Sequence, residues 1–284
     1  MPFIPVLGKW ATRVAAWALA LGTVCGLGAW VMAQNPAAPP REIRLLGAAV
    51  FGPGEELRYR VHYGFINAGE ALLTVDRRVR EQADRPCYQV EVSGRTIGAF
   101  SRFMKIRNVW GTYLDTAQMK PLRAYRNIRE NRYRLDEDLQ FDYARRLVSV
   151  KRTERKDTAY RIPNPVFDIV SGYYFLRQVD YSQLAPGTVM SLDAYFDDAQ
   201  YKFKVRFVGR EAVKTKFGRV SALVLSPIMP DNSFFDGENA IRLWMSDDAN
   251  RVPLKVSAEL LVGSVDLDLE DYRGTRRPLA VFKD

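Results

Sequence analysis

The sequence contains little of the chemistry that most enzymes and metalloproteins use. It has one histidine, His62, and two cysteines, Cys25 and Cys87, among 284 residues. These are too few soft ligands for a zinc or iron site of histidine and cysteine, and too few thiols for a disulfide-stapled scaffold. It also lacks a Gly-x-Ser-x-Gly elbow, a phosphate-binding loop and a dinucleotide-binding fingerprint. We therefore expect that the protein binds no metal or cofactor and is not an enzyme, and we assign no catalytic residue.

Long apolar runs are confined to the N-terminus, which excludes a polytopic membrane protein. Hydrophobic residues make up 47% of the chain and charged residues 26%, so whole-chain disorder and a collagen-like repeat are excluded as well. The length fits one large domain or two small ones. The formal net charge is +9.

Residues 1–33 predict an export signal. Lys9 and Arg13 are their only charges, and an apolar run follows, from Val14 to Met32. The alternative is an uncleaved inner-membrane anchor, because the run approaches the ~20 residues that span a bilayer. Both interpretations place the rest of the chain outside the cytoplasm, so we expect a periplasmic protein.

The end of this segment resembles a signal-peptidase site. Val31 and Ala33 have the small size required before the cut, which predicts cleavage between Ala33 and Gln34. A lipid anchor on Cys25 is not expected, because Val24 is too large for the residue before a lipidated cysteine. Cleavage would leave Cys87 as the one thiol, so we expect no internal disulfide and interpret Cys87 as a small buried hydrophobe.

From about Val50 onward the dominant pattern is an alternation of apolar and polar residues, broken by turn residues every ten or so positions. The segments around 57–63, 88–92, 139–143, 201–207, 254–262 and 265–269 show it most clearly. This period of two is typical of strands with one face buried. We count about a dozen strands, mostly antiparallel, and expect a hairpin at Gly263-Ser264. The fold class is therefore mainly β, with one or more curved antiparallel sheets or an open barrel.

Two segments break this alternation and predict helices. Ile97–Met104 could form one or two helical turns. The pair Asn164-Pro165 is typical of a helix N-cap and first turn, and it predicts a helix over about 164–178. Its apolar residues cover most of the circumference, so we expect it to be buried in the concave face of the sheet, with Arg177 exposed at its end.

Four separated phrases resemble one known family. They are FGPGEELRY from Phe51 with GFINAGEA from Gly64, FDIVSGYYFLR from Phe167, LWMSDDANRVPL from Leu243, and VGSV from Val262. Their order and spacing over about Phe51 to Tyr272 resemble an exported bacterial family filed as domain of unknown function 3108. The resemblance implies a β-rich envelope protein, similar in outline to the lipoprotein carriers, with a curved sheet around a helix. It implies no reaction and no catalytic residue.

We divide the chain accordingly. Residues 1–33 are the signal peptide, 34–49 a linker rich in proline and alanine, 50–273 a single β-rich domain, and 274–284 a basic tail. An alternative is that two sheets meet near 162–180, with the helix between them.

Few charged residues form a pattern that points to chemistry. His62 falls on the polar face of its strand with Arg58 and Arg60, where we expect a solvated or hydrogen-bonded histidine. Asp247 and Asp248 lie in a turn whose spacing does not fit a calcium loop, so a turn-capping role is favoured. Basic residues concentrate between Leu122 and Asp157, and export argues against nucleic acid as their partner. The speculative ligand or partner surface consists of Arg123, Tyr125, Arg126, Tyr133, Arg134 and Tyr173.

Three functions remain open on the sequence. The first is a non-catalytic envelope protein that binds an amphiphile, such as a lipid, or another envelope protein through a curved sheet. The second is a periplasmic hydrolase that uses carboxylates, with Asp168, Asp247 or Asp248 as candidates. The third is a structural or assembly factor with no small ligand.

Overall fold

The computed structural model describes residues 43–153, 155–228 and 239–282. The expected signal peptide, its cleavage site and Cys25 lie outside these residues. Within the described residues, no helix is long and apolar enough to cross a membrane.

The described residues form a mainly antiparallel sheet of sixteen strands. The first nine strands are β1 (Glu56–Tyr63), β2 (Ile66–Val75), β3 (Arg80–Gln82), β4 (Arg85–Thr96), β5 (Arg107–Asp115), β6 (Pro121–Glu130), β7 (Tyr133–Asp142), β8 (Leu147–Arg152) and β9 (Thr158–Arg161). The other seven are β10 (Val189–Phe196), β11 (Ala199–Thr215), β12 (Gly218–Pro227), β13 (Ile241–Ser246), β14 (Pro253–Glu259), β15 (Ser264–Arg273) and β16 (Val281–Phe282). The helices are α2 (Phe100–Phe103), α3 (Ile169–Gln178) and the 3-10 helix η1 (Tyr181–Gln183).

The strand order describes two sequential meanders that share one sheet. Strands β1, β2 and β4 to β9 follow one another on one side, and β10 to β15 follow one another on the other. The meanders are joined where the last long strand, β15, pairs antiparallel with the first, β1, from Tyr63↔Val265 to Glu56↔Arg273. The described residues therefore form one sheet rather than two sheets that meet at the helix.

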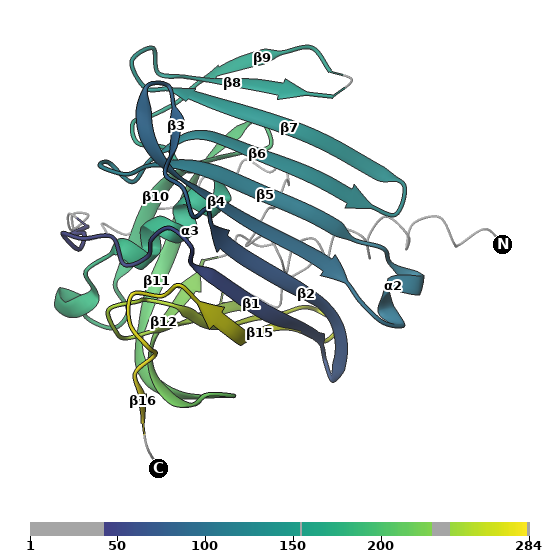
Figure 1. Ribbon diagram of the computed structural model, residues 1–284, viewed down its shortest axis with the longest axis vertical. Helices are drawn as coiled ribbons and strands as arrows, with labels where there is room; N and C mark the ends of the chain where they lie inside the picture. Colours follow the sequence, from purple (N-terminus) through teal and green to yellow (C-terminus); the bar gives the residue numbers. More distant parts are fainter. Residues whose placement is uncertain (1–42, 154, 229–238, 283–284) are drawn as a thin grey trace, which may run out of the picture.

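The sheet curves strongly, and α3 lies inside the curve (Figure 1). The helix packs against β4 and β5 on one side and against β10 on the other. Strands β9 and β10 end the strand order, so among the described residues the sheet is curved but not closed. The backbone of Phe167 forms a single parallel bridge with β10 at Ala194, just before the helix begins. The mainly β class with one buried helix is confirmed.

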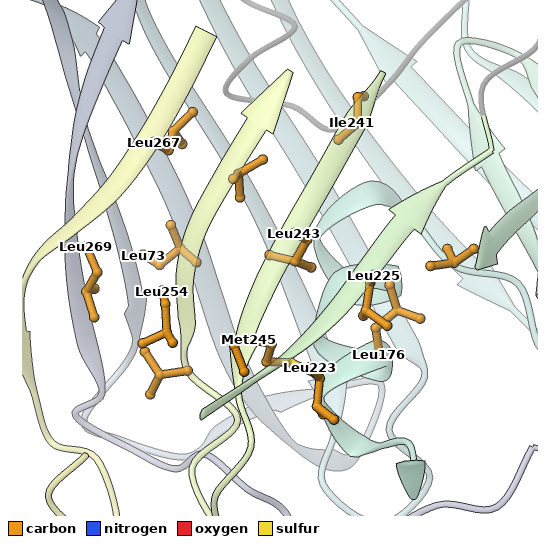
Figure 2. Close-up of a cluster of buried hydrophobic side chains, with 14 of the residues drawn as sticks. Leu73, Leu176, Leu223, Leu225, Ile241, Leu243, Met245, Leu254, Leu267 and Leu269 are labelled. Atoms are coloured by element: carbon orange, nitrogen blue, oxygen red, sulfur yellow. The ribbon is translucent and has the colours of Figure 1, made fainter. Parts of the chain in front are cut away.

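The alternation seen in the sequence places one side-chain set inside the curve. Leu57, Tyr59 and Val61 of β1 are buried, while the residues between them lie on the outer face. Figure 2 shows side chains of the largest cluster, which contains aliphatic residues from β2 and from β12 to β15 together with Leu176 of α3. Burial of this apolar surface is the main force that holds the helix against the sheet.

The helix begins later than the sequence predicts. Asn164-Pro165 lies in a bend before the helix, and the N-cap is Asp168, whose carboxylate accepts hydrogen bonds from the backbone N–H groups of Val170 and Ser171. Both an Asn-Pro pair and an aspartate can precede a helix, so the local pattern alone could not choose between them. The short helix expected within 97–104 is confirmed as α2.

The expectation that Arg177 is exposed is wrong. Its side chain is 0% exposed, and its two terminal nitrogens bond both oxygens of the buried Glu55 at 2.6 and 2.8 Å. The guanidinium also donates to the backbone oxygen of Asn250 and lies over the rings of Phe51 and Tyr174. The helix end that looked free in the sequence therefore faces the N-terminal side of β1, in the protein interior.

Both expected terminal segments contribute to the fold. In the predicted linker, Leu45 forms a bridge with Val179 at the end of α3, and the N–H of Leu46 donates to the oxygen of Gln178. In the predicted basic tail, Leu279 is buried and β16 pairs with β12.

Candidate functional site

The six residues proposed as a ligand or partner surface do not form one site. Arg123 and Tyr125 lie on the outer face of β6. The ring of Tyr125 covers Gly111 of β5, where an added Cβ would lie 2.2 Å from the ring. Its hydroxyl donates to Glu91 and accepts from Gln89, while Arg123 pairs with Asp138 at 2.6 Å. These side chains bond one another across the outer face of the sheet.

Arg126 points the opposite way, to the inner face, and is buried. It bonds Glu137 of β7 at 2.6 Å and Asp197, in the turn between β10 and β11, at 2.9 Å. Its guanidinium lies over the ring of Phe196, 4.6 Å from the centroid, and Phe196 stacks on Trp110. Arg126 therefore attaches the tip of the β10–β11 hairpin to the inner face of the other meander.

Arg152 of β8 makes the same connection. It pairs with Glu137 and with Asp198 of the hairpin turn. Burial acts to raise the pKa of the Asp198 carboxyl, but the hydrogen bond and charge of Arg152 outweigh it and hold that pKa below its ordinary value. We call Arg126, Glu137, Arg152, Asp197 and Asp198 the latch, because together they hold the two edges of the curved sheet near each other.

The remaining three residues lie in two further places. Tyr133 and Arg134 are exposed at the turn between β6 and β7. Tyr173 is partly buried on α3, and burial raises the pKa of its hydroxyl.

The carboxylates considered for hydrolysis have structural partners. Asp168 is buried, and its second oxygen accepts a hydrogen bond from Thr112 of β5 at 2.8 Å. Burial raises the pKa of Asp168, against the opposing effect of its hydrogen bonds. Asp247 pairs with Arg210 and Arg251, and Asp248 accepts hydrogen bonds from the backbone of Asn250 and Arg251. The turn-capping role expected for Asp248 is confirmed.

His62 lies on the polar strand face, as the alternation predicts, and Cys87 is buried, as expected for a small hydrophobe. His62 is on the outer face of β1, with its Nε2 atom 3.6 Å from Asp268 of β15. Cys87 is a buried free thiol, and burial raises its pKa to about 11, with a smaller contribution from Asp115. No group of three or more metal-ligating side chains comes together in the described ranges.

A groove of about 610 Å³ lies on the outer face of the sheet, across β15, β1, β2, β4 and β5. It was not predicted from the sequence. Its ionisable side chains are four arginines and two glutamates: Arg58, Arg60, Arg95, Arg107, Glu70 and Glu270. The groove is thus a basic depression in the part of the sheet where β15 and β1 join the two meanders.

The strand register explains this arrangement. Arg60, Glu70, Arg95 and Arg107 are successive partners across β1, β2, β4 and β5, so they form one row on the outer face. Glu70 bonds Arg60 at 3.1 Å and Arg95 at 2.8 Å. Arg107 is exposed and has no carboxylate partner among the described side chains. Arg95 and Arg107 thus face each other, and Arg95 alone has an acidic partner, Glu70, which it shares with Arg60. Like charges opposite each other on a sheet favour an added anion.

The next outward-facing row of the groove begins with Arg58 of β1 and continues as a short, mostly apolar strip. It contains Leu72, Ser93 and Val109, which are successive partners across β2, β4 and β5 and are all half-buried. An apolar strip beside a row of guanidinium groups can accept a molecule with an aliphatic part and an anionic part. The sequence signal that could have located the groove is the presence of arginines at the polar positions of β1, β4 and β5. Only the strand register shows that these arginines are aligned.

A strongly curved, unclosed antiparallel sheet around one buried helix, with a basic groove on its outer face, defines a β-barrel-like protein. The chain belongs to the family described as protein of unknown function (DUF3108), whose profile matches residues 58–270. No curated protein matches the sequence.

A solved structure shares the fold at low sequence identity. The β-barrel-like protein of domain of unknown function DUF1849 from Brucella abortus is 13% identical, with a TM-score of 0.52, over 79% of this chain and 98% of that one. The hypothetical protein CT021 from Chlamydia trachomatis is 9% identical, with a TM-score of 0.36, over 83% of this chain and 95% of that one. The Brucella protein supports the fold assignment alone.

Proposed function

We propose that this protein is a non-catalytic protein of the bacterial cell envelope that binds an amphiphile with an anionic head in the outer groove. The observation that carries the proposal is the row of Arg60, Arg95 and Arg107 beside the apolar strip. Guanidinium groups bind phosphate and carboxylate oxygens through paired hydrogen bonds, and the strip offers an apolar surface to a chain.

The proposed location in the cell envelope rests on the export signal expected in residues 1–33. Export by this segment would deliver the groove to the periplasm, where amphiphiles with phosphate or carboxylate heads occur at membrane surfaces. We expect the protein isolated from an envelope fraction to begin at Gln34, as determined by N-terminal sequencing. An intact Met1 would contradict cleavage and favour the anchor.

The groove is tested with dodecyl phosphate as the probe and with inorganic phosphate as its head alone. We expect dodecyl phosphate to bind more tightly in calorimetric titrations, because only it contacts the apolar strip. The double variant Arg95→Gln, Arg107→Gln should weaken its binding about tenfold or more, since it removes two charge-assisted contacts.

The matched control is Arg145→Gln, Arg155→Gln, which makes the same change in charge at exposed positions outside the groove. It should bind dodecyl phosphate as the unaltered protein does. Equal weakening in both variants would reduce the effect to net charge and refute the groove. Equal affinity for the two probes would refute an amphiphile.

A further inference from the structure

One end of the sheet carries an unusual number of exposed apolar side chains. Phe65 is 96% exposed, Phe103 87% and Val262 76%. With their exposed neighbours they form what we call the apolar rim, consisting of Phe65, Ile66, Phe103, Tyr133, Leu261 and Val262. Single exposed hydrophobes are ordinary, but a group of this size on neighbouring turns marks an interaction surface.

The rim is continuous, because the four segments that carry it contact one another. These segments are the β1–β2 turn, the β14–β15 turn, α2 and the β6–β7 turn. The N–H of Gly64 donates to the oxygen of Ser264, and the hydroxyl of Tyr63 donates to the oxygen of Val262 at 3.0 Å. These bonds join the β1–β2 turn to the β14–β15 turn. The ring of Tyr63 also lies 6.4 Å from that of Phe100, which connects both turns to α2.

The last connection extends the rim to the β6–β7 turn. Lys105, just after α2, exchanges two hydrogen bonds with Asn131, at 2.8 and 2.9 Å. In Figure 1 the β1–β2 turn, α2 and the β6–β7 turn follow one another along one edge of the molecule.

Basic side chains accompany the rim. Arg102, Lys105, Arg132 and Arg134 are exposed on α2, on the loop after it and on the β6–β7 turn. The exposed acid nearest to these turns in sequence is Glu259, at the end of β14. Among the described residues around these turns, the four exposed cations outnumber the one exposed acid, which makes the surface around α2 and the β6–β7 turn complementary to an anionic surface.

We infer that the apolar rim docks on the surface of an anionic lipid bilayer, with its aromatic and aliphatic tips in the interface and the four cations among the headgroups. Aromatic and aliphatic residues beside lysine and arginine are the combination that binds such interfaces. The rim adjoins Arg95 and Arg107 at the α2 ends of β4 and β5, so docking would bring the groove close to the bilayer. The inference goes beyond the proposed ligand and does not require it.

The test places an environment-sensitive fluorophore on Phe103→Cys in the whole protein, and on Val79→Cys as the control. Val79 is also an exposed apolar residue, but it follows β2 at the opposite end of the sheet. Cys87 is buried, so it should react little with the label. With vesicles of phosphatidylcholine and phosphatidylglycerol, we expect a blue shift of emission at position 103 and none at position 79. This local readout holds whether the N-terminal segment is cleaved or retained.

Two sets of variants separate the contributions of apolar and charged residues. Phe65→Ser, Phe103→Ser should reduce vesicle binding about tenfold or more, because it removes the two most exposed rings. Arg102→Gln, Lys105→Gln should reduce it to a similar extent, and added salt should reduce it further. All four positions are exposed, so the variants should keep their melting temperatures and their affinity for dodecyl phosphate.

Several outcomes would overturn the inference. One is a label at position 103 that stays in water on anionic vesicles. Another is a label that shifts equally at positions 79 and 103. A shift at position 103 that appears only with a protein fraction of the envelope would identify a protein partner instead of lipid. Loss of dodecyl phosphate binding in the groove variant alone would leave docking intact, so the two proposals fail separately.

Discussion

The ion pair of Arg177 and Glu55 shows most clearly what single residues hide in a sequence. A charged residue at the end of a helix is normally solvated, and its partner lies 122 positions away in the chain. Burial alone would lower the pKa of Arg177, but the Glu55 carboxylate outweighs it and raises that pKa. The guanidinium therefore stays charged inside the protein, with the Glu55 carboxylate as its counter-charge.

Loss of either partner should be costly for this reason. We expect Arg177→Met to lower the free energy of unfolding by about 3 to 5 kcal/mol, because it leaves the Glu55 carboxylate buried without a counter-charge. This is a large part of an ordinary domain stability of ~5 to 15 kcal/mol. The double variant Glu55→Gln, Arg177→Met should regain part of the loss. Urea denaturation of the unaltered protein, the single variants Glu55→Gln and Arg177→Met, and the double variant measures the coupling. A double variant as unstable as the sum of the two single variants would contradict it.

The candidate site residues differed in how well the sequence located them. Tyr133 belongs to the apolar rim and Arg134 follows it in the chain, and both are exposed, as a partner surface requires. Arg126 was placed with them because the sequence shows only its charge, whereas its direction depends on the face of β6 that it occupies. Phe65 carried a usable signal, since an aromatic residue directly after Gly64 in a turn has no core to enter.

At the scale of elements, α3 depends on Asp168 as well as on its apolar contacts. The carboxylate caps the helix N-terminus while buried against Thr112. The raised pKa means that the folded protein holds a proton on Asp168 more tightly than the unfolded chain does. This contribution to stability is present at low pH and is lost as the pH rises through the folded-state pKa.

Asp168→Asn should therefore change the pH dependence of unfolding in a defined direction. An amide oxygen can still accept the bonds from Val170 and Ser171, but it carries no charge to desolvate. We expect the stability of the variant, relative to the unaltered protein, to rise as the pH increases from about 3 towards 7. Thermal or urea unfolding across that range provides the measurement.

Asp180 gives the matched control at the second helix N-terminus. It caps η1 through Ser182, and those hydrogen bonds lower its pKa. Asp180→Asn should then lose relative stability as the pH rises, which is the opposite sign. If both variants lose stability equally with pH, burial does not govern Asp168.

The sequence located the strands along the chain better than it predicted which strands pair with each other in the sheet. Alternation with a period of two is a local signal, and it located strands such as β1, β4 and β14. The latch was not predictable, because Asp197 and Asp198 look like ordinary turn residues until the hairpin tip meets Arg126 and Arg152. The groove was hidden for the same reason, since its arginines align only through the register of four strands.

At the scale of the whole molecule, the sequence predicted a curved antiparallel sheet around one helix, and the structure confirms it. The resemblance to the family of unknown function is confirmed as well. What the sequence could not supply is the pairing of β15 with β1, because no local pattern records which strand completes an open edge. That single pairing turns two meanders into one sheet.

The β1–β15 pairing also determines when folding can be completed during synthesis of the chain. Every other neighbour along the main strand order is the next strand in the chain or lies beyond the short strand β3, so each meander can assemble from contacts that are close in sequence. The pairing of β1 with β15 closes a loop of some two hundred residues. Forming it is slow, because closing so long a loop costs chain entropy. Until the C-terminal strands emerge, β1 has an open edge that could pair with a second chain. Newly made protein therefore needs protection from aggregation until its last long strand is in place, and a chain that ends before β15 should never leave that state.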